Sequence, residues 1–221
     1  MFVVQIEGNI GSGKSTFIEY IKDNLEKFHP SSSGLNIKYI FEPISDWQNV
    51  NGINLLELYY ENPKRFAELF QTNAFFTLLK SSLKINYEKI DLIIMERSLY
   101  SSIIFFCNLL LADNLITQEF YSIIMNAYQD FEDIIIHPNI VIYFQIDNSD
   151  ITILKTNIQK RQRKGENIIS IEYLKKLNNI YNQEIKKYKN VSTINIKMLK
   201  TKSDKIKTFN SLIDKILANI K

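Results

Sequence analysis

The sequence predicts a single α/β domain over residues 1–221, with a five-stranded parallel sheet and helices on both of its faces. The first observation behind this prediction is that short apolar runs alternate with longer segments of helical periodicity, as in chains of βαβ units. The second is that no internal repeat or low-complexity linker divides the 221 residues. The third is the composition, since 45% apolar residues can build one core of this size.

The predicted strands are nearly continuous runs of apolar and β-branched residues. They are Phe2–Glu7, Ile37–Phe41, Leu92–Met95, Ile140–Ile146 and Ser192–Ile196. Such runs lack polar alternation because helices cover both faces of a parallel sheet. Ligands of these sheets bind at the carboxyl ends of the strands, so the residues that follow each run are the candidates for chemistry.

The helices are predicted from apolar spacing and from capping residues. In the first helix Phe17, Ile21, Leu25 and Phe28 form one apolar stripe, which predicts its buried face. Ser203 is the predicted cap of the last helix. The remaining predicted helices span residues 62–87, 98–112, 117–131 and 170–188.

Charge and cysteine content exclude several classes of protein. The 27 basic and 24 acidic side chains leave a net charge of +3, too even a balance for a dedicated nucleic-acid or membrane surface. The single cysteine, Cys107, excludes a disulfide framework and predicts a small buried side chain in a reducing compartment. No secretion signal and no apolar run of roughly 20 residues is found. We therefore expect a cytoplasmic protein without nucleic-acid or membrane partners.

A glycine-rich segment follows the first predicted strand and leads directly into a helix. It reads Gly8-Asn9-Ile10-Gly11-Ser12-Gly13-Lys14-Ser15-Thr16, a complete G-x-x-x-x-G-K-S/T pattern. Backbone N–H groups of such a loop converge on phosphate oxygens, while the lysine reaches the terminal phosphates and the following hydroxyl can ligate Mg²⁺. The pattern predicts a site for Mg²⁺ and a nucleoside triphosphate, formed by Gly8, Asn9, Gly11, Ser12, Gly13, Lys14, Ser15 and Thr16.

Charged residues follow the second and third predicted strands. Glu42 comes after one, and the pair Glu96-Arg97 ends the other, so all three side chains should meet at the edge that carries the phosphate loop. A carboxylate beside an arginine suits phosphoryl transfer, with one group for Mg²⁺ and one for the developing charge. The D-x-x-G and N-K-x-D patterns of GTPases and the Asp-Glu strand end of motor ATPases are missing.

A basic segment with one acid follows the fourth predicted strand. It runs from Arg161 to Glu166, and such a run is usually a solvated face. Beside a phosphate loop it is better interpreted as a lid at about residues 160–168. Arg161 and Arg163 would then screen the transferring γ-phosphoryl group.

Together these features resemble the deoxyribonucleoside kinase family, which includes deoxycytidine, deoxyguanosine, mitochondrial thymidine and insect multisubstrate kinases. The resemblance extends from about Val3 to Leu177 and implies a P-loop kinase fold with a short lid. It also implies an ATP-dependent, Mg²⁺-requiring 5′-kinase of nucleotide salvage. The segments that carry it are 7–15, Glu42-Pro43 with Trp47, 49–58, 70–72, 96–101, 161–166 and 172–174.

The resemblance assigns catalytic roles. Glu42 would act as general base toward the sugar 5′-hydroxyl, and Arg97 would hold both Glu42 and the phosphoryl oxygens. Glu96 would complete the Mg²⁺ shell with Ser15. Lys14, Arg161 and Arg163 would stabilise charge on the transferred group.

The resemblance also assigns the nucleoside site. Tyr60 and Glu166 would bond the 3′-hydroxyl, Gln71 would make a two-point contact with the base, and Phe106 would stack on it. Gln71 is notable without the resemblance, because an amide among aromatic neighbours needs a partner. The walls of the pocket would be Ile10, Trp47 and Phe70.

Base preference is expected to follow from Leu78 and Ser102. Family members that prefer deoxycytidine or purines have an Arg–Asp pair at these positions, and thymidine-preferring members have apolar or small residues. The resemblance therefore implies pyrimidine preference with thymidine accepted, and the small Ala74 leaves room for a 5-methyl group. Ile103 stands where relatives commonly have an arginine. Whatever that arginine supports in relatives must be supported by other residues in this chain.

Two alternatives remain open from the sequence. A nucleoside monophosphate kinase would share the fold and the lid, although its Asp-Arg-Tyr type of motif is missing here. A non-catalytic nucleotide-binding subunit would keep Lys14 but would have no use for Glu42, Arg97 and Glu166 together.

The resemblance also implies a homodimer, because relatives form homodimers through helices. The apolar segments 62–87 and 98–112 are compatible with such an interface.

Overall fold

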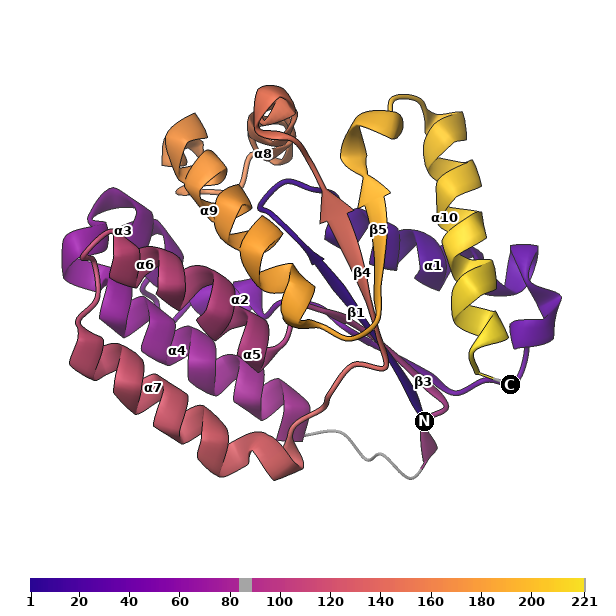
Figure 1. Ribbon diagram of the computed structural model, residues 1–221, viewed down its shortest axis with the longest axis horizontal. Helices are drawn as coiled ribbons and strands as arrows, with labels where there is room; N and C mark the ends of the chain where they lie inside the picture. Colours follow the sequence, from indigo (N-terminus) through magenta and orange to yellow (C-terminus); the bar gives the residue numbers. More distant parts are fainter. Residues whose placement is uncertain (84–88, 221) are drawn as a thin grey trace.

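A computed structural model of the chain describes residues 1–83 and 89–220. Its five strands form one parallel sheet in the order β2-β3-β1-β4-β5 (Figure 1). The predicted fold class is therefore confirmed. The strands are β1 (Phe2–Gly8), β2 (Ile37–Ile40), β3 (Leu92–Glu96), β4 (Ile140–Gln145) and β5 (Val191–Asn195).

Strand β1 occupies the centre of the sheet, between β3 and β4. Its residue Ile6 is in register with Glu96 of β3, and Gly8 is in register with Phe144 of β4. The chain thus leaves β1 between the carboxyl ends of its two neighbours. The glycine-rich loop begins at this point, and the side chains that follow β3 lie next to it.

Two helices cover one face of the sheet, α1 (Lys14–Phe28) and α10 (Lys202–Ala218) (Figure 1). Phe17 of α1 packs between the strands and α10, with ring centroids 5.6 Å from Phe144 and 4.7 Å from Phe209. The predicted stripe of α1 is correct except at its end. Phe28, the last residue of the helix, is exposed, and Ile18 joins the buried face instead.

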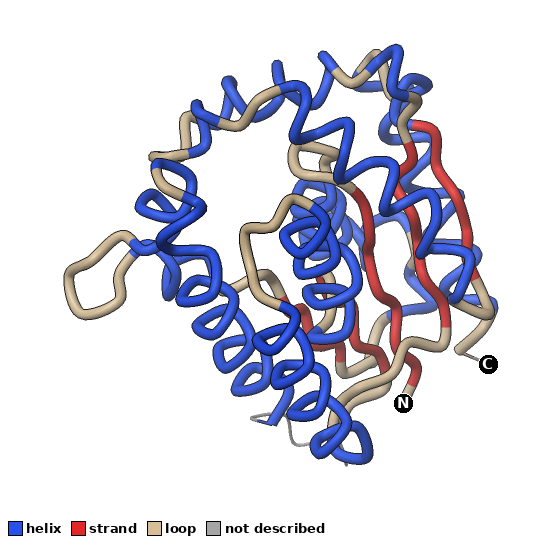
Figure 2. The backbone as a smooth tube through the Cα atoms, turned by 60° about the vertical axis from the view of Figure 1, so that its left-hand side comes forward, coloured by secondary structure: helices blue, strands red, loops and turns tan. Residues whose placement is uncertain are grey.

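A layer of helices covers the other face (Figure 2). The segment after β3 was predicted as one helix over 98–112, but it contains a π-helical stretch, Ser102–Cys107, between two short α-helices. A π-helical stretch widens a helix locally, and such stretches recur at functional sites. The layer consists of α4 (Pro63–Leu83), α5 (Leu99–Ser101), the π-helix, α6 (Asn108–Ala112), α7 (Gln118–Phe131) and α9 (Ile171–Glu184).

Short helices connect these layers at the carboxyl edge of the sheet. The sequence did not predict α2 (Ile44–Gln48) or α3 (Leu55–Glu61), which follow β2, and α8 (Thr152–Arg161) leads into the lid segment. None of the helices within residues 1–83 and 89–220 is long and apolar enough to cross a membrane. Turns of 3₁₀-helix lie at Pro30–Ser32, Glu132–Ile134, Asn148–Asp150, Glu166–Ile168, Ile185–Lys187 and Ile196–Met198.

Several predicted boundaries differ from the structure at helix ends. Helix α9 ends at Glu184 and continues as a 3₁₀ turn, short of the predicted Tyr188. Helix α4 ends at Leu83, and the predicted extension over 84–87 lies outside the described residues. The cap of α10 is Thr201 and not Ser203, because Thr201 and Asp204 form a reciprocal capping box.

The capping box gives a test of this correction. Replacing Thr201 by alanine removes the side chain that accepts from the Asp204 N–H, and should lower the free energy of unfolding by about 1 kcal/mol. Ser203→Ala is the matched control, since an exposed position inside the first turn should change stability little. Urea unfolding of both variants measures the difference; equal losses would contradict the observed cap.

Candidate active site

A deep cavity opens at the carboxyl edge of the sheet, beside the glycine-rich loop. Its volume is about 730 Å³, including the open space at its mouth. Residues from the glycine-rich loop after β1 to Tyr173 of α9 contribute to its lining, so segments far apart in the sequence meet here. The structure brings every side chain predicted to contact the nucleoside to this one cavity: Ile10, Trp47, Tyr60, Phe70, Gln71, Ala74, Leu78, Arg97, Ser102, Phe106 and Glu166.

An ion pair between Glu42 and Arg97 lies in this cavity. Arg97 Nη1 donates to Glu42 Oε1 at 2.5 Å, and the side chains are 5% and 12% exposed for Arg97 and Glu42. Burial alone would raise the pKa of Glu42, but the nearby Arg97 and Lys14 outweigh it and hold the pKa below its usual value. Glu42 is therefore a carboxylate at neutral pH, as a proton acceptor must be.

Arg97 is fixed on several sides. Its Nε donates to Tyr181 Oη and its Nη2 to the Gly8 carbonyl, both at 3.0 Å, and the guanidinium lies 4.9 Å from the centre of the Phe106 ring. Its backbone has φ of 59°, a left-handed conformation that is unfavourable for a residue with a side chain. Such strain is typical of functional positions and persists only where the surroundings hold it.

Lys14, Ser15 and Glu96 form a second charged group beside the loop. Ser15 Oγ lies 2.9 and 3.1 Å from the two Glu96 oxygens, and Lys14 Nζ lies 3.8 Å from Glu96 Oε1. Burial and the charge of Arg97 lower the pKa of Lys14 to about 8. Burial, followed by repulsion from Glu42, raises the pKa of Glu96. Both pKa shifts disfavour the charged forms of these side chains, and burial is the largest cause of each.

The glycine-rich loop has the conformation that its sequence requires. Gly11 has φ of 78°, and a Cβ at this position would lie 2.6 Å from the Leu154 carbonyl oxygen, so only glycine fits. The Ser12 hydroxyl is buried without a protein partner, which is expected where a ligand or water supplies one. Gly8 and Asn9 lie behind the loop, where their polar groups bond Arg97 and the Leu174 carbonyl.

A second hollow lies on the other side of the loop. The predicted nucleotide ligands Gly13, Ser15 and Thr16 line it, together with the lid residues Arg161 and Arg163. Its opposite wall carries a cluster of amino groups near the start of α10. Cations around a phosphate loop favour a polyanionic ligand. The lysines that line this hollow besides Lys14 are Lys160, Lys197, Lys200 and Lys205.

The lid segment folds back on its own carboxylate. Arg161 Nε and Arg163 Nη1 donate to the two oxygens of Glu166 at 2.6 and 2.9 Å, and Glu166 is buried. The turn between them passes so close to α3 that a Cβ on Gly165 would lie 2.8 Å from the Glu57 Cα. The three predicted lid residues thus come together at the mouth of the cavity.

The inner end of the cavity is mostly apolar and contains one amide. Gln71 is buried, and its Oε1 accepts a bond from the Cys107 thiol at 3.7 Å. Trp47 packs edge-on against Phe70 and donates its indole N–H to Thr77. Cys107 is a buried free thiol, as the sequence predicted.

Sequence reasoning missed other residues of the cavity. Tyr59 stacks on Phe70 and its hydroxyl lies 3.3 Å from that of Tyr173, and Ile44 and Leu56 complete the wall. The signals were the neighbour Tyr60 and the segments 49–58 and 172–174, in which Leu56 and Tyr173 were noted without a role. Glu7 ends the first predicted strand and was noted in the segment 7–15 without a role, whereas Tyr181, which bonds Arg97, gave no signal.

A complete phosphate loop beside a buried carboxylate–guanidinium pair defines a phosphotransferase of the P-loop kinase type. The sequence model of the family described as "Deoxynucleoside kinase" matches residues 4–221, and the chain belongs to this family.

Three relatives are 25% to 33% identical to the chain over the aligned residues. "Putative kinase protein 029R" of Invertebrate iridescent virus 3 is 30% identical over 194 residues, which are 88% of each chain. "Probable deoxycytidine kinase FPV151" of Fowlpox virus is 33% identical over 77% of this chain and 66% of its own. Mitochondrial thymidine kinase 2 of Homo sapiens is 25% identical over 82% of this chain and 63% of its own.

The close approach of the lid to α3 gives a test of the site. Gly165→Ala should lower the free energy of unfolding by about 1 kcal/mol or more beyond Gly52→Ala, because an added Cβ must displace the backbone of Glu57. Gly52 is the matched control, since its φ of 89° is close to the 85° of Gly165 while nothing lies within 4 Å of its Cβ position. Kinase activity should fall only for Gly165→Ala, and equal effects in denaturant and activity assays would refute the contact.

Proposed function

We propose that the protein is a Mg·ATP-dependent deoxyribonucleoside 5′-kinase of nucleotide salvage that prefers pyrimidines and accepts thymidine. The observation that carries the proposal is the Glu42–Arg97 pair, which lies between the phosphate loop and a deep, mostly apolar cavity. A nucleoside in this cavity would direct its 5′-hydroxyl toward the carboxylate and the loop. The match to the deoxynucleoside kinase family supports this proposal, as do the relatives named as a probable deoxycytidine kinase and a thymidine kinase.

The reaction follows from the two oxygens of Glu42. Oε1 accepts from Arg97, and we assign Oε2 to the 5′-hydroxyl of the sugar. The hydroxyl oxygen attacks the γ-phosphorus, the bond to the β-phosphate oxygen breaks, and ADP leaves. An alcohol is too weak an acid to ionise first, so Glu42 orients it and accepts its proton late in the reaction. Arg97 stabilises negative charge on the transferred group from the same side.

Ser15 and Glu96 are the residues that would hold Mg²⁺. Both present oxygen atoms, the ligand type that Mg²⁺ prefers, and they lie within 3.1 Å of each other beside the loop. Within residues 1–83 and 89–220 no three carboxylate, histidine or cysteine side chains gather as an independent metal site. This fits an ion that completes its shell with nucleotide phosphates and water. Bound Mg²⁺ would neutralise charge on the β- and γ-phosphates.

The phosphates of ATP would lie on the loop between the two hollows. Lys14 would reach the β- and γ-phosphates, and Arg161 and Arg163 would approach from the lid. Because both guanidinium groups pair with Glu166 in the ligand-free protein, the γ-phosphate would have to share them with this carboxylate. Glu166, with Tyr60, would then bond the 3′-hydroxyl of the sugar.

Base preference is proposed to depend on Gln71. Its amide would bond the edge of a pyrimidine, with Phe106 stacked on the base and Ala74 next to the 5-position. Leu78 and Ser102 also line this end of the cavity and carry no charge, so nothing at these two positions favours the amino group of cytosine over the carbonyl of thymine.

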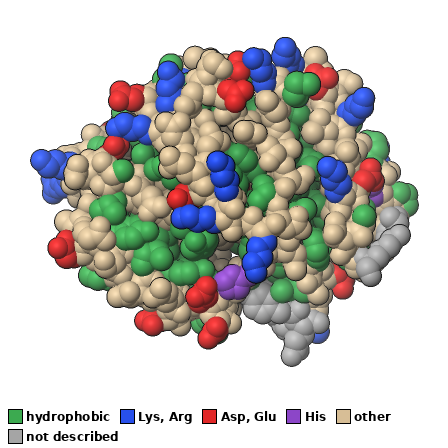
Figure 3. All heavy atoms as spheres, viewed as in Figure 1, with side chains coloured by type: hydrophobic (Ala, Val, Ile, Leu, Met, Phe, Trp, Pro, Cys, Tyr) green, Lys and Arg blue, Asp and Glu red, His purple; other side chains and the backbone are tan. Residues whose placement is uncertain are grey.

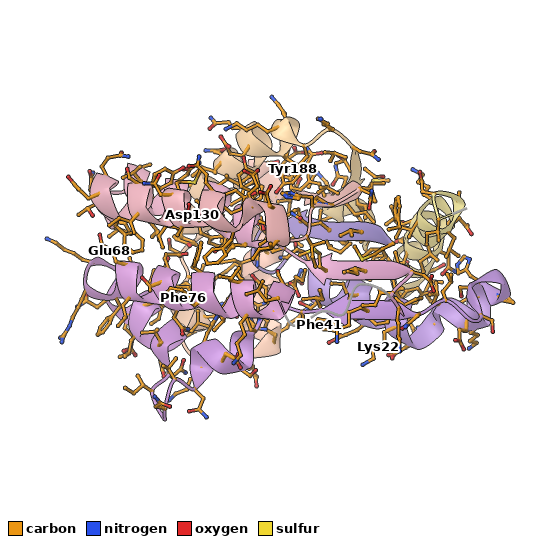
Figure 4. All side chains as sticks on the ribbon, turned by 90° about the horizontal axis from the view of Figure 1, so that it is seen from below. Lys22, Phe41, Glu68, Phe76, Asp130 and Tyr188 are labelled. Atoms are coloured by element: carbon orange, nitrogen blue, oxygen red, sulfur yellow. The ribbon has the colours of Figure 1, made fainter. Side chains whose placement is uncertain are left out.

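The outer surface of the helical layer supports a homodimer. Leu69 and Phe76 of α4 are 55% and 59% exposed, and Ile123 of α7 is 64% exposed. Figure 4 shows Phe76 on α4 next to α7, which carries Asp130, and in Figure 3 hydrophobic side chains gather over this layer. Large apolar side chains that share one surface favour association, and we propose that a second copy of the chain covers them.

Glu42→Gln tests the proposed base. The amide keeps the shape of the side chain but cannot accept the proton, so turnover of thymidine with Mg·ATP should fall by about 10²-fold or more. Binding of both substrates should persist, as measured by calorimetry. Asp46→Asn is the control, because Asp46 is an exposed acid four residues further along on α2 and should leave turnover unchanged. Equal turnover in Glu42→Gln and wild type would remove Glu42 from the mechanism.

A substrate panel tests the proposed specificity. The four natural deoxynucleosides and dTMP are each offered with Mg·ATP, and thymidine should be phosphorylated while dTMP, the substrate of a monophosphate kinase, should not. Leu78→Arg combined with Ser102→Asp introduces the charged pair, and should shift relative kcat/KM toward deoxycytidine or deoxyadenosine by about tenfold or more. An unchanged ranking would mean that other residues read the base.

A further inference from the structure

Glu7 is a buried acid that the proposed reaction does not use. It lies on β1, directly before the glycine-rich loop, and its side chain is 0% exposed. A carboxylate is costly to bury, and it is kept only where partners compensate the loss of water. Its two oxygens have different partners: Gln5 Nε2 donates to Oε1 at 2.7 Å, and Tyr181 Oη donates to Oε2 at 3.2 Å.

The direction of the bonds between Arg97, Tyr181 and Glu7 is fixed by chemistry. A guanidinium can only donate, so Tyr181 Oη must accept the bond from Arg97 Nε. The single hydroxyl proton of Tyr181 is then directed to Glu7 Oε2. Since Gln5 also donates to Glu7, both carboxylate oxygens act as acceptors. Each bond in such a chain polarises the next, so the negative charge of Glu7 is felt at Arg97.

Arg97 is therefore linked to two carboxylates through different nitrogen atoms, to Glu42 through Nη1 and to Glu7 through Nε. Glu42 touches it directly from the substrate side, and Glu7 reaches it through Tyr181 from behind. During phosphoryl transfer Glu42 gains the proton of the 5′-hydroxyl and loses its negative charge. The buried guanidinium would then lose the charge of the one carboxylate that bonds it directly, while Glu7 stays linked to it by hydrogen bonds through Tyr181 and Glu96 acts on it only through space. A guanidinium in a desolvated site is prone to shift its position when the carboxylate beside it loses its charge, unless another group holds it.

We propose that Glu7 is a positioning residue that, through the Tyr181 hydroxyl, keeps the Arg97 guanidinium in place while Glu42 becomes protonated. The inference rests on the proposed function. Glu7 lines neither of the two hollows beside the glycine-rich loop. Its effect should therefore appear in turnover and not in ground-state binding, because Glu42 itself holds Arg97 before the proton moves.

Tyr181→Phe is the decisive variant. It removes one hydroxyl and keeps the ring, which stacks on Phe105 at 3.8 Å between centroids. Tyr143→Phe is the matched control, since Tyr143 is also buried and stacks on Tyr181, but its hydroxyl bonds Asn182 and not Arg97. Thermal melting of the two variants measures how much each hydroxyl contributes to stability, separately from any effect on turnover. Glu7→Gln is the second variant, and it removes the charge at nearly constant size.

The expected result with thymidine and Mg·ATP is a loss in kcat of about tenfold for Tyr181→Phe, the effect of one hydrogen bond to a charged group. The KM for both substrates should change less than twofold, and Tyr143→Phe should keep wild-type kcat. Glu7→Gln should lose at least as much, and the double variant should be no slower than Glu7→Gln, because the two residues act in series.

Three results would overturn the inference. These are an unchanged kcat in Tyr181→Phe, an equal loss in Tyr143→Phe, and additive losses in the double variant. If Glu7→Gln fails to fold, the comparison of kcat between Tyr181→Phe and Tyr143→Phe still tests the inference. Failure of the proposed function is a separate observation: the wild-type protein would then transfer no phosphate to any of the four deoxynucleosides, and the inference would fall with it.

Discussion

The buried guanidinium of Arg97 is the group on which the arrangement of the site depends. A charge removed from water needs partners on every side, and this group obtains them from β1, the segment after β2, and α9. Removal of any one partner would leave a desolvated donor, so the three segments are held in fixed relation to one another. The order of strands makes this possible, because β3 lies between β2 and β1 and Arg97 can reach to either side.

The same constraint explains the mixture of charges around the loop. Lys14 and Arg97 are both buried; burial and the charge of Arg97 lower the pKa of Lys14, while carboxylates led by Glu42 raise the pKa of Arg97 against the effect of its own burial. Glu42, Glu96 and Glu7 supply this compensation from three directions, yet Glu42 and Glu96 repel each other. A polyanionic ligand with its counter-ion would reduce this imbalance. The charges around the loop thus suit a polyanionic ligand.

The sequence predicted the sheet and most residues that line the cavity, but not the residues that support Arg97 from behind. Strand ends and the glycine-rich pattern are local signals, and in a parallel sheet they must meet at one edge, so Glu42, Glu96 and Arg97 were brought together correctly. Thr201 was overlooked because Ser203 is an equally good capping residue by type, and only the backbone decides between them. Tyr181 and Glu7 escaped because hydrogen bonds between elements 174 residues apart leave no sequence pattern.

The position of Cys107 has a chemical consequence for this protein. The thiol is 1% exposed, and burial raises its pKa to about 12, so almost none of it is thiolate at neutral pH. Alkylating reagents and peroxides react with the thiolate, and they must also reach it. The folded protein therefore shields this thiol from both, and labelling of its single cysteine would report the opening of the helical layer beside Gln71, at the inner end of the cavity.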